Sequence, residues 1–480
     1  MRKTFLHLLK MVVSAQVTFV DLSAFSELEG FLYGGPLATT WFVGTVQKSN
    51  WFSLVPTTLR DTSTPNFGLK TSSSINRTAD YALYCWFRVQ IPQIMLNPDP
   101  TIYDNATVRW TKKLGHNLFN DVTLTHNELV AQEFNSYWLD MNYMFHIPEG
   151  KRVGYNSMIG NVAANYNPVL KGVALGTGSY ISVPLPFWFS RDTGRALPVA
   201  ALPFNQTNIN YEWRQLSELV VVYPGVAGGG GSRIATVSDV VVYGQPTVTP
   251  TFINPQTYCM YAMVHNDERA KMAQAPRDIL MHQLQTVQVI PFSNVSSGAV
   301  QSFDIRLSNS IVALYFAAEN TSIFNAPTAS GMERSNYTTE IEYSGDDPLD
   351  RVQLLYENNV RLDYGSDVFA YILPYHHCDQ MPDETGYHIW SYALNTNDLN
   401  PCGSTNYTKL ANVTIQYTPS ASAQNAANTI TPVRSDGTPL QWVSSTGALI
   451  PLPQTYQHIL IARNHNIGRV ANGSFGFPTL

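Results

Sequence analysis

Apolar and polar residues alternate along much of the chain with a period of two. In three separate segments the apolar residues stand at every second position: Phe87, Val89 and Ile91; Phe303, Ile305 and Leu307; Val413, Ile415 and Tyr417. This pattern predicts strands with one buried face. Stretches that contain many of the 30 Gly and 29 Pro residues separate such segments at strand-length spacing. The fold class is therefore expected to be mostly β, with sandwiches or barrels rather than βαβ units.

Two segments show helical spacing instead. From Asn127 to about Phe145, large apolar residues recur three and four positions apart, which predicts a helix with Asn127 as N-cap that covers one end of a sandwich. A second, short helix is predicted over Asp267–Met272, the most charged stretch of the chain. We interpret it as a connector between two domains.

A division at this connector gives two β-rich parts of similar length. We expect an N-terminal arm at residues 1–29, a first domain at residues 30–265 and a second domain at residues 266–480. Each domain is large for one sandwich, so long loops are expected. Three polar or glycine-rich segments without a sustained apolar period fit that role: Gly225–Ser232, Asn320–Asp347 and Ser420–Thr438.

The first residues allow three interpretations. Arg2 and Lys3 followed by apolar residues resemble a secretory signal, although His7 and Lys10 interrupt the apolar stretch. The same residues have helical spacing, which fits an amphipathic arm that docks on a partner or a membrane surface. In the third interpretation, translation begins at Met11.

Composition narrows the range of functions. Charged residues make up 13% of the chain, aromatic residues 12%, and the net charge is -6. Charge is about half as frequent as in typical soluble domains, and without a basic block we expect no direct, specific nucleic-acid binding. No apolar run reaches the roughly 18 residues of a membrane span. The four scattered cysteines are expected to be reduced thiols: Cys85, Cys259, Cys378 and Cys402.

Signals for catalysis or ligand binding are weak, and we predict no catalytic, cofactor-binding or metal-binding residue. Gly228–Gly231 lacks the Lys and the following helix of a phosphate-binding loop, which favours a plain flexible loop. His376–Asp379 with His388 offers zinc or copper ligands, but the spacing fits no zinc pattern and favours a polar turn. The acidic residues within Asp346–Asp350 lack the spacing of a calcium loop. A pair of carboxylates for glycoside hydrolysis needs a defined separation in space, which the sequence does not show, so this activity is left open.

Several Asn-x-Ser/Thr motifs occur in a composition rich in Asn, Ser and Thr, so chance matches are expected. They carry sugar only if the chain passes through the secretory pathway. Asn320 and Asn336, in one of the long loops, are expected to be the most exposed of these glycosylation candidates.

Residues 183–206 read VPLPFWFSRDTGRALPVAALPFNQ. This segment predicts a bulky strand at Leu185–Phe189, a turn at Arg191–Gly194 and a proline-bounded apolar strand at Ala196–Pro203. It closely resembles the hallmark segment of the major capsid proteins of large icosahedral eukaryotic DNA viruses. The hallmark residues in this sequence are Pro186, Phe187, Trp188, Phe189, Gly194, Leu197, Pro198 and Pro203.

Further motifs of that family occur in the same order, and they are most similar to those of the iridovirus and marseillevirus branch. The resemblance covers about Phe31 to Leu480. The motifs are YGGP at Tyr33–Pro36, NSMIGNV at Asn156–Val162, the segment Asn266–Gln285, GSTNY at Gly403–Tyr407 and GSFGFP at Gly473–Pro478.

The resemblance implies an all-β double jelly roll, that is, two eight-stranded antiparallel β-sandwiches side by side, with short helices in the connecting loops. It also implies a homotrimer that forms a pseudo-hexameric capsomer, and an icosahedral virion shell of such capsomers assembled in the host cytoplasm. Neighbouring capsomers, minor capsid proteins and penton proteins are the implied partners. Asn320–Asp347 and Gly225–Ser232 would form an outward tower, and the N-terminal arm would lie on the inner face, towards an internal membrane.

The expected function is then architectural, without a cofactor or an enzymatic activity. Phe187, Trp188 and Phe189 are expected to anchor the core of the first sandwich rather than to act directly in assembly. The alternative from another class is a jelly-roll carbohydrate-binding protein or glycoside hydrolase. A penton-type or minor shell protein is a third possibility, but such proteins commonly use one jelly roll.

Overall fold

The computed structural model describes residues 19–20, 23–24, 26–36, 38–44, 46, 48–223, 225, 230–274, 276–322, 330–331, 333–340, 343, 345–428 and 453–478. Contacts divide the chain into two units, Met1–Asn50 and Trp51–Leu480. In the first unit a short helix, α2 (Glu27–Leu32), begins after Ser26, whose backbone N–H donates to the Glu29 carboxylate at 3.0 Å. The signal-peptide and Met11 interpretations concern residues that lie outside the described ones.

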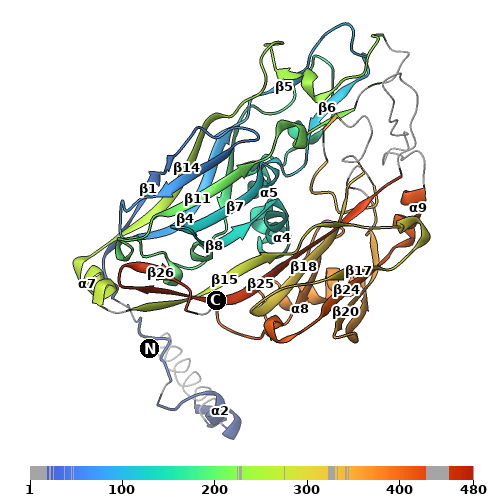
Figure 1. Ribbon diagram of the computed structural model, residues 1–480. Coiled ribbons are helices and arrows are strands. Elements are labelled where there is room, and N and C mark those ends of the chain that lie inside the picture. The colour runs from blue at the N-terminus through green and yellow to red at the C-terminus, as the bar shows by residue number, and fades with distance from the viewer. Residues whose placement is uncertain are drawn as a thin grey trace, which may run out of the picture. The chain divides into compact units, whose positions relative to one another are not determined.

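In the second unit two β-sandwiches lie side by side (Figure 1). One sheet of the first sandwich has the strand order β1 (Phe52–Thr58), β14 (Ile253–Val264), β4 (Tyr81–Gln90) and β10 (Tyr180–Leu185). The facing sheet has the order β2 (Arg60–Asp61), β3 (Lys70–Ile75), β11 (Thr207–Trp213), β7 (Phe119–His126) and β8 (Leu129–Phe134). The sheets meet at Phe87 of β4, whose ring centroid lies 4.5 Å from that of Trp213 and 5.9 Å from that of Phe119.

The second sandwich is built in the same way. One sheet has the order β15 (Arg277–Thr286), β25 (Tyr456–Ala471), β18 (Ser310–Asn320) and β22 (His388–Ser391), joined by the short strands β16 (Ile290–Pro291), β23 (Thr405–Asn406) and β26 (Ser474–Gly476). The facing sheet has the order β17 (Gln301–Asp304), β24 (Val413–Pro419), β20 (Leu349–Tyr356) and β21 (Asn359–Gly365). Phe316 of β18 and Tyr417 of β24 meet across the sheets, with ring centroids 5.8 Å apart.

Both sandwiches share one topology. When the eight main strands of each are counted in chain order, with the strands of two or three residues left out, the two sheets run 1-8-3-6 and 2-7-4-5 in both sandwiches. The neighbouring strands pair antiparallel. This is the jelly roll of two Greek keys, so the expected all-β double jelly roll is confirmed.

Smaller elements fill the connections. Two small sheets have the orders β19 (Ser330–Gly331), β12 (Val220–Tyr223), β6 (Thr107–Trp110), β9 (Val169–Leu170), and β13 (Val240–Val242), β5 (Ile94–Leu96). The helices of this unit are α3 (Leu114–Asn117), α4 (Ser136–His146), α5 (Glu149–Met158), α6 (Ala163–Tyr166), α7 (Asn266–Gln274), α8 (Leu373–His377) and α9 (Ala421–Asn428). Among the described residues, no helix has the length and apolar character needed to cross a membrane.

The predicted elements agree with the structure in most places. Alternating burial in β4 and β24 confirms two of the three strand patterns, and β17 contains only the first residue of the third, Phe303. Helix α7 confirms the short helix predicted at Asp267–Met272.

The long helix predicted from Asn127 is wrong in its first half. That half forms β8, and Asn127 stands before this strand with a φ of 54°. Helix α4 begins only at Ser136, with Asn135 as N-cap accepting a hydrogen bond from the Trp138 N–H at 3.1 Å. A spacing of four residues also fits one face of a strand, so the pattern alone did not separate the two structures. The helix also does not cover one end of a sandwich, because Trp138 packs 5.2 Å from Tyr315 of β18.

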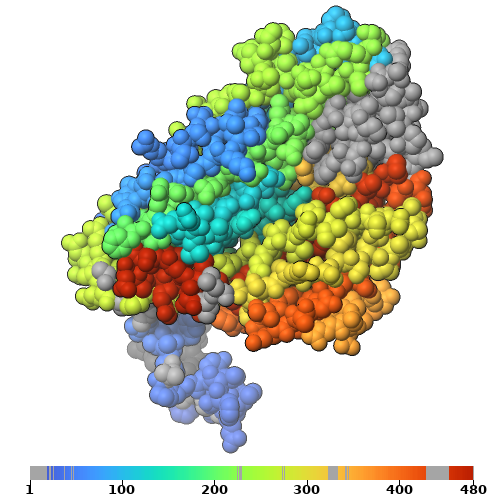
Figure 2. All heavy atoms as spheres, viewed as in Figure 1, coloured from blue at the N-terminus to red at the C-terminus, as the bar shows by residue number. Residues whose placement is uncertain are grey.

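In the sheet formed by β15, β25, β18 and β22, the central strand β18 is buried on both faces. Phe316 and Leu460 point into the second sandwich, whereas Tyr315 and Ile461 belong to one buried cluster with Phe87 of the first. Accordingly β18 shows no alternation of exposure. We call the contact of this sheet with the first sandwich the seam. Figure 2 shows the cyan atoms of the first sandwich directly against the yellow atoms of the second.

Candidate functional site

The hallmark segment, residues 183–206, leaves β10 and runs along the seam. The bulky strand predicted at Leu185–Phe189 is wrong, because β10 ends at Leu185 and a 3₁₀ turn follows at Trp188–Ser190. The Trp188 N–H donates to the side-chain Oε1 of Gln132 at 2.7 Å instead of to a backbone carbonyl of a neighbouring strand. A side chain of β8 therefore fixes the point at which the chain turns away from the sheet.

The second half of the segment is also held by turns. The turn predicted at Arg191–Gly194 is confirmed, and the Asp192 carboxylate there accepts the N–H two residues further on at 3.2 Å. The strand predicted at Ala196–Pro203 is wrong, since only a single bridge forms, between Leu197 and Ala82, before another 3₁₀ turn. Prolines lack the N–H that a central strand needs, which agrees with this irregular path.

The three hallmark aromatic residues are buried. Phe187, Trp188 and Phe189 are 0%, 3% and 1% exposed. The Phe187 ring lies 5.4 Å from that of Phe134 in the first sandwich, whereas the Trp188 ring stacks 6.0 Å from that of Phe475 in β26. Trp188 therefore packs across the seam, in addition to the core of the first sandwich.

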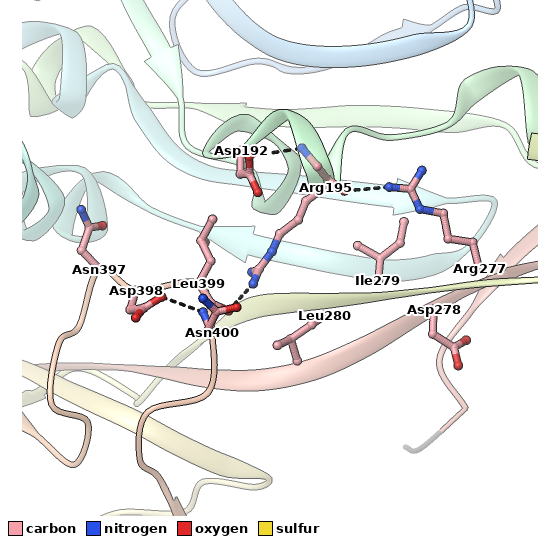
Figure 3. A pocket seen from close by; sticks show the side chains of 11 residues that line it. Asp192, Arg195, Arg277, Asp278, Ile279, Leu280, Asn397, Asp398, Leu399 and Asn400 are labelled. Atoms are coloured by element: carbon pink, nitrogen blue, oxygen red, sulfur yellow. Dashed lines mark hydrogen bonds between the residues drawn. The ribbon is translucent and has the colours of Figure 1, made fainter. Parts of the chain in front are cut away.

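Each of the remaining hallmark residues either accepts a hydrogen bond at its backbone carbonyl or is buried. The carbonyls of Pro186, Gly194 and Pro203 accept hydrogen bonds from Gln132, Arg277 and Arg77 respectively, and Leu197 and Pro198 are buried. Figure 3 shows Arg277 of β15 directed at the turn that contains Asp192 and Arg195.

A polar pocket of about 550 Å³ lies beside this turn, between β15 and residues 397–400 (Figure 3). Arg195 reaches across it and donates to the carbonyl of Leu399. Asp278, on the opposite wall, is paired with Arg469 at 2.6 Å. These contacts hold residues 397–400 of the second sandwich against the hallmark turn of the first.

Arg463 of β25 is a cation buried in the seam, at 2% exposure. Its Nη1 donates to the carbonyl of Thr396 at 2.6 Å, and its Nη2 donates to Nε2 of His146 at 3.2 Å. Burial, with Arg463 beside it, lowers the pKa of His146 well below its usual value, so the ring is neutral and accepts this bond. Sequence analysis missed Arg463; the available signal was a single charge at the end of the apolar run Ile459–Ala462.

Two ion pairs join the halves of the chain, one buried on both sides and one in which only the lysine is buried. Arg109 of β6 pairs with Glu333, and Lys113 pairs with Glu384 at 2.7 Å. Burial raises the pKa of the Glu333 carboxyl, and the neighbouring Arg109 opposes that shift. Sequence analysis missed both pairs, because no local spacing relates residues so far apart in the chain.

The long loop Asn320–Asp347 is not the exposed loop that was expected. Its strand β19 pairs with β12, Gly331 opposite Val221. All of its residues 333–339 are buried. Residues 323–329, together with 226–229 and 429–438 of the other two predicted loops, lie outside the described residues.

The expected exposure of the glycosylation candidates is also wrong. Asn320 and Asn336 are 3% and 1% exposed. The Nδ2 of Asn320 donates to Oε1 of Gln454 at 2.7 Å, and the Nδ2 of Asn336 donates to the carbonyl of Glu340 at 2.8 Å. The nitrogen that would carry a sugar is therefore engaged inside the fold at both positions.

The candidate metal ligands are dispersed. His376 and His377 end helix α8, so the polar turn predicted there is a helix end. His388 is buried elsewhere, with its Nε2 2.7 Å from Oδ2 of Asp347. Within the described part of the chain, no group of three or more His, Cys, Asp or Glu side chains is placed to hold a metal ion. All four cysteines are free thiols, and Cys85 stands opposite Cys259 across β4 and β14.

The outer face of the sheet β1–β14–β4–β10 is aromatic and partly exposed. The rings of Trp86 and Tyr258 stack at 5.2 Å, and Tyr84 and Leu54 are 42% and 49% exposed. A groove of about 920 Å³ extends from Tyr84 and Trp86 to helices α4 and α5. We call Leu54, Tyr84, Trp86 and Tyr258 the aromatic face. Exposed apolar patches of this kind mark surfaces that bind partners.

Known proteins resemble the chain along nearly all of its length. The family model described as "Major capsid protein N-terminus" matches residues 40–252, and the model "Large eukaryotic DNA virus major capsid protein" matches residues 268–476. The major capsid protein of Wiseana iridescent virus is 41% identical and covers 95% of this chain and 92% of its own length. The chain belongs to this family of major capsid proteins.

The similarity to iridovirus major capsid proteins that the sequence led us to expect is confirmed. The major capsid protein of Costelytra zealandica iridescent virus is 39% identical over 96% of this chain and 98% of its own length. Among solved structures, VP54 of PBCV-1 superposes with a TM-score of 0.64 at 18% identity, covering 92% of this chain and 100% of its own. At that identity the likeness concerns the fold alone. These matches favour the capsid interpretation over the carbohydrate-binding or glycoside hydrolase alternative.

Proposed function

We propose that three copies of this chain close into a pseudo-hexameric capsomer and that such capsomers tile an icosahedral virion shell. The observation that carries the proposal is the pair of jelly rolls with identical strand order in one chain, fixed to each other by a buried seam. Three such chains around a threefold axis present six similar sandwiches, which gives a hexagonal outline from a cyclic trimer. The family membership of the chain supports the shell role.

The division of labour along the chain follows from this proposal. The first jelly roll lies within residues 30–265, with its strands beginning at β1, and the second lies within residues 266–480, with α7 as the connector between β14 and β15. The arm, residues 1–29, lies on the inner face, where it meets minor capsid proteins and an internal membrane. Penton proteins and neighbouring capsomers bind at the edges, assembly takes place in the host cytoplasm, and the chain catalyses no reaction.

The aromatic face is the part of the trimer contact that the structure supports best. Half-exposed Leu54 and Tyr84 beside the stacked Trp86 and Tyr258 form an apolar surface. Obligate interfaces are richer in aromatic residues and poorer in charge than ordinary surfaces. We assign this face to contact with a second copy of the chain.

Negative-stain images of the purified protein, together with one surface variant, test the proposal. The unaltered chain is expected to give particles with a pseudo-hexagonal outline. The double variant Leu54→Asp and Tyr84→Asp is expected to keep the near-ultraviolet circular dichroism of the fold and to give only single subunits. Leu394→Asp, at a position that is 76% exposed, is the matched control and should leave the particles intact. Hexagonal particles from the double variant would refute the assigned contact, and their absence from the unaltered chain would refute the trimer.

A further inference from the structure

A small cavity lies in the seam beneath the hallmark segment. Its volume is about 20 Å³, which accommodates one water molecule or one ion of similar size. The lining residues that matter come from both sandwiches and from α4: Trp138, Trp188, Arg191, Arg195, His282 and Arg463. Arg191 also lines the wider groove beside the aromatic face, so the cavity and this groove are neighbours.

The cavity collects positive charge without a counter-charge. Arg195 and Arg463 are 9% and 2% exposed, and both donate to neutral carbonyl oxygens, those of Leu399 and Thr396. Among the described residues, none of the three guanidinium groups has a carboxylate within the 4.0 Å of an ion pair. Unpaired buried charge is strongly unfavourable. Burial, with Arg463 beside it, lowers the pKa of Arg191 only to about 9, so Arg191 stays charged at neutral pH.

The same side chains carry hydrogen-bond donors that have no acceptor. Within the described structure, Nη1 of Arg191, Nε1 of Trp138, Nε1 of Trp188 and both ring nitrogens of His282 are buried without a partner. Arginine and tryptophan can only donate, and a neutral histidine offers one donor and one acceptor. A water molecule could accept from only two of these donors, and it would donate its own hydrogens to the few acceptors of the lining, such as the side-chain oxygen of Asn142 or one ring nitrogen of His282. An anion can accept from the two indole N–H groups, from Nη1 of Arg191 and from the single ring N–H of a neutral His282.

We propose that this cavity binds a small inorganic anion of the size of chloride, held by Arg191, Arg463 and His282 with the indole N–H groups of Trp138 and Trp188. The ion neutralises part of the buried charge and joins the hallmark segment and α4 to β15 and β25. It thus stabilises the seam inside each subunit, whatever the subunit assembles into.

Thermal unfolding of the purified full chain tests this proposal. The melting temperature is measured in sodium chloride and in sodium gluconate at equal ionic strength, because gluconate is too large for the cavity. Chloride is expected to raise the melting temperature by about 2 °C or more, as a ligand specific to the folded state does. Arg191→Gln should abolish this difference. Arg306→Gln, at an exposed position of the second sandwich, is the matched control and should retain it.

A direct observation removes the dependence on any variant. Crystals of the unaltered protein are transferred from chloride to bromide, and the anomalous signal of bromide is located. A peak beside Arg191 and Arg463 is expected. The absence of both the peak and the chloride-dependent shift would mean that water fills the cavity, and the proposal would be overturned. Stabilisation by phosphate but not by chloride would contradict the stated size of the ion and would overturn it as well.

Discussion

The ring of Trp188 stacks on that of Phe475 with centroids 6.0 Å apart and an interplanar angle of 20°. Trp188 belongs to the hallmark segment, which leaves the first sandwich, and Phe475 belongs to the last strand of the second. Phe475 also lies 4.4 Å from the ring of His126 in β7. A Cβ added at Gly468 would stand only 2.6 Å from the Phe475 ring, so only glycine fits at position 468, facing this ring. The last hairpin of the chain therefore closes the seam.

Trp188→Ala is expected to lower the free energy of unfolding by about 3–5 kcal/mol, because it leaves a cavity where a large buried ring packs. Urea unfolding followed by fluorescence measures the change. Trp51→Ala, at a position that is 64% exposed, is the control and should have little effect. The folded Trp188→Ala protein should still assemble. A variant of normal stability that stays monomeric would contradict the packing role and would indicate a direct role in assembly.

The buried pair of Arg109 and Glu333 gives a double-mutant test of how the long loop is fixed. Glu333→Leu alone should destabilise the protein by about 3–5 kcal/mol, because it leaves the Arg109 guanidinium buried without its partner. The double variant Arg109→Met with Glu333→Leu should recover most of that loss, since no unpaired charge remains. Chemical unfolding of the unaltered chain, of each single variant (Arg109→Met and Glu333→Leu) and of the double variant measures the coupling. Additive losses would show that the two side chains do not interact.

Stability is expected to fall as the solution is acidified below pH 6.5. Burial lowers the pKa of His126 to about 4 and that of His458 to about 3. Between pH 6.5 and these values the unfolded chain binds protons that the folded chain does not, so each residue costs about 2 kcal/mol of stability at pH 5. Urea midpoints between pH 7.5 and 5 measure the slope. His458→Phe should make the slope of unfolding free energy against pH shallower, by the equivalent of one proton fewer taken up on unfolding. An unchanged slope would contradict a buried neutral His458.

The four thiols are expected to differ in reactivity. Cys85 and Cys259 are 1% and 0% exposed, and burial raises the pKa of the Cys378 thiol to about 11. Only the thiolate reacts quickly, so Cys402 should be labelled first by a maleimide in the native protein. Peptide mass spectrometry of labelled native and urea-unfolded samples measures the order. Rapid labelling of Cys85 or Cys259 in the native state would show that the first sandwich opens readily.

Sequence patterns predicted the strands that have one face in water, such as β4 and β24, because apolar and polar residues alternate along a strand with one buried face. They could not separate β8 from a helix, since residues four apart share a face in both. They also predicted strands in the hallmark segment where turns occur. There the apolar side chains are buried as expected, but the backbone bonds go to a side chain, as the N–H of Trp188 shows.

The seam was beyond the reach of local patterns. Both faces of β18 are buried, so its sequence Ser310–Asn320 is almost continuously apolar and carries no period that says which residue faces which sandwich. Buried polar residues such as Arg463 and Glu333 have partners in the other half of the chain, namely His146 and Arg109, which no local pattern identifies. The burial of Asn320 and Asn336 was equally beyond local patterns, because the Asn320 side chain bonds to Gln454, far away in the sequence, and the segment that contains both residues folds back on itself.

The solution mass of the purified protein tests the central claim most directly. Sedimentation analysis should show a species of about 160 kDa, three times the 53.5 kDa of one chain, as a closed cyclic trimer requires. A stable monomer of 53.5 kDa at the concentrations used for imaging would contradict the capsomer as the unit from which the shell is built.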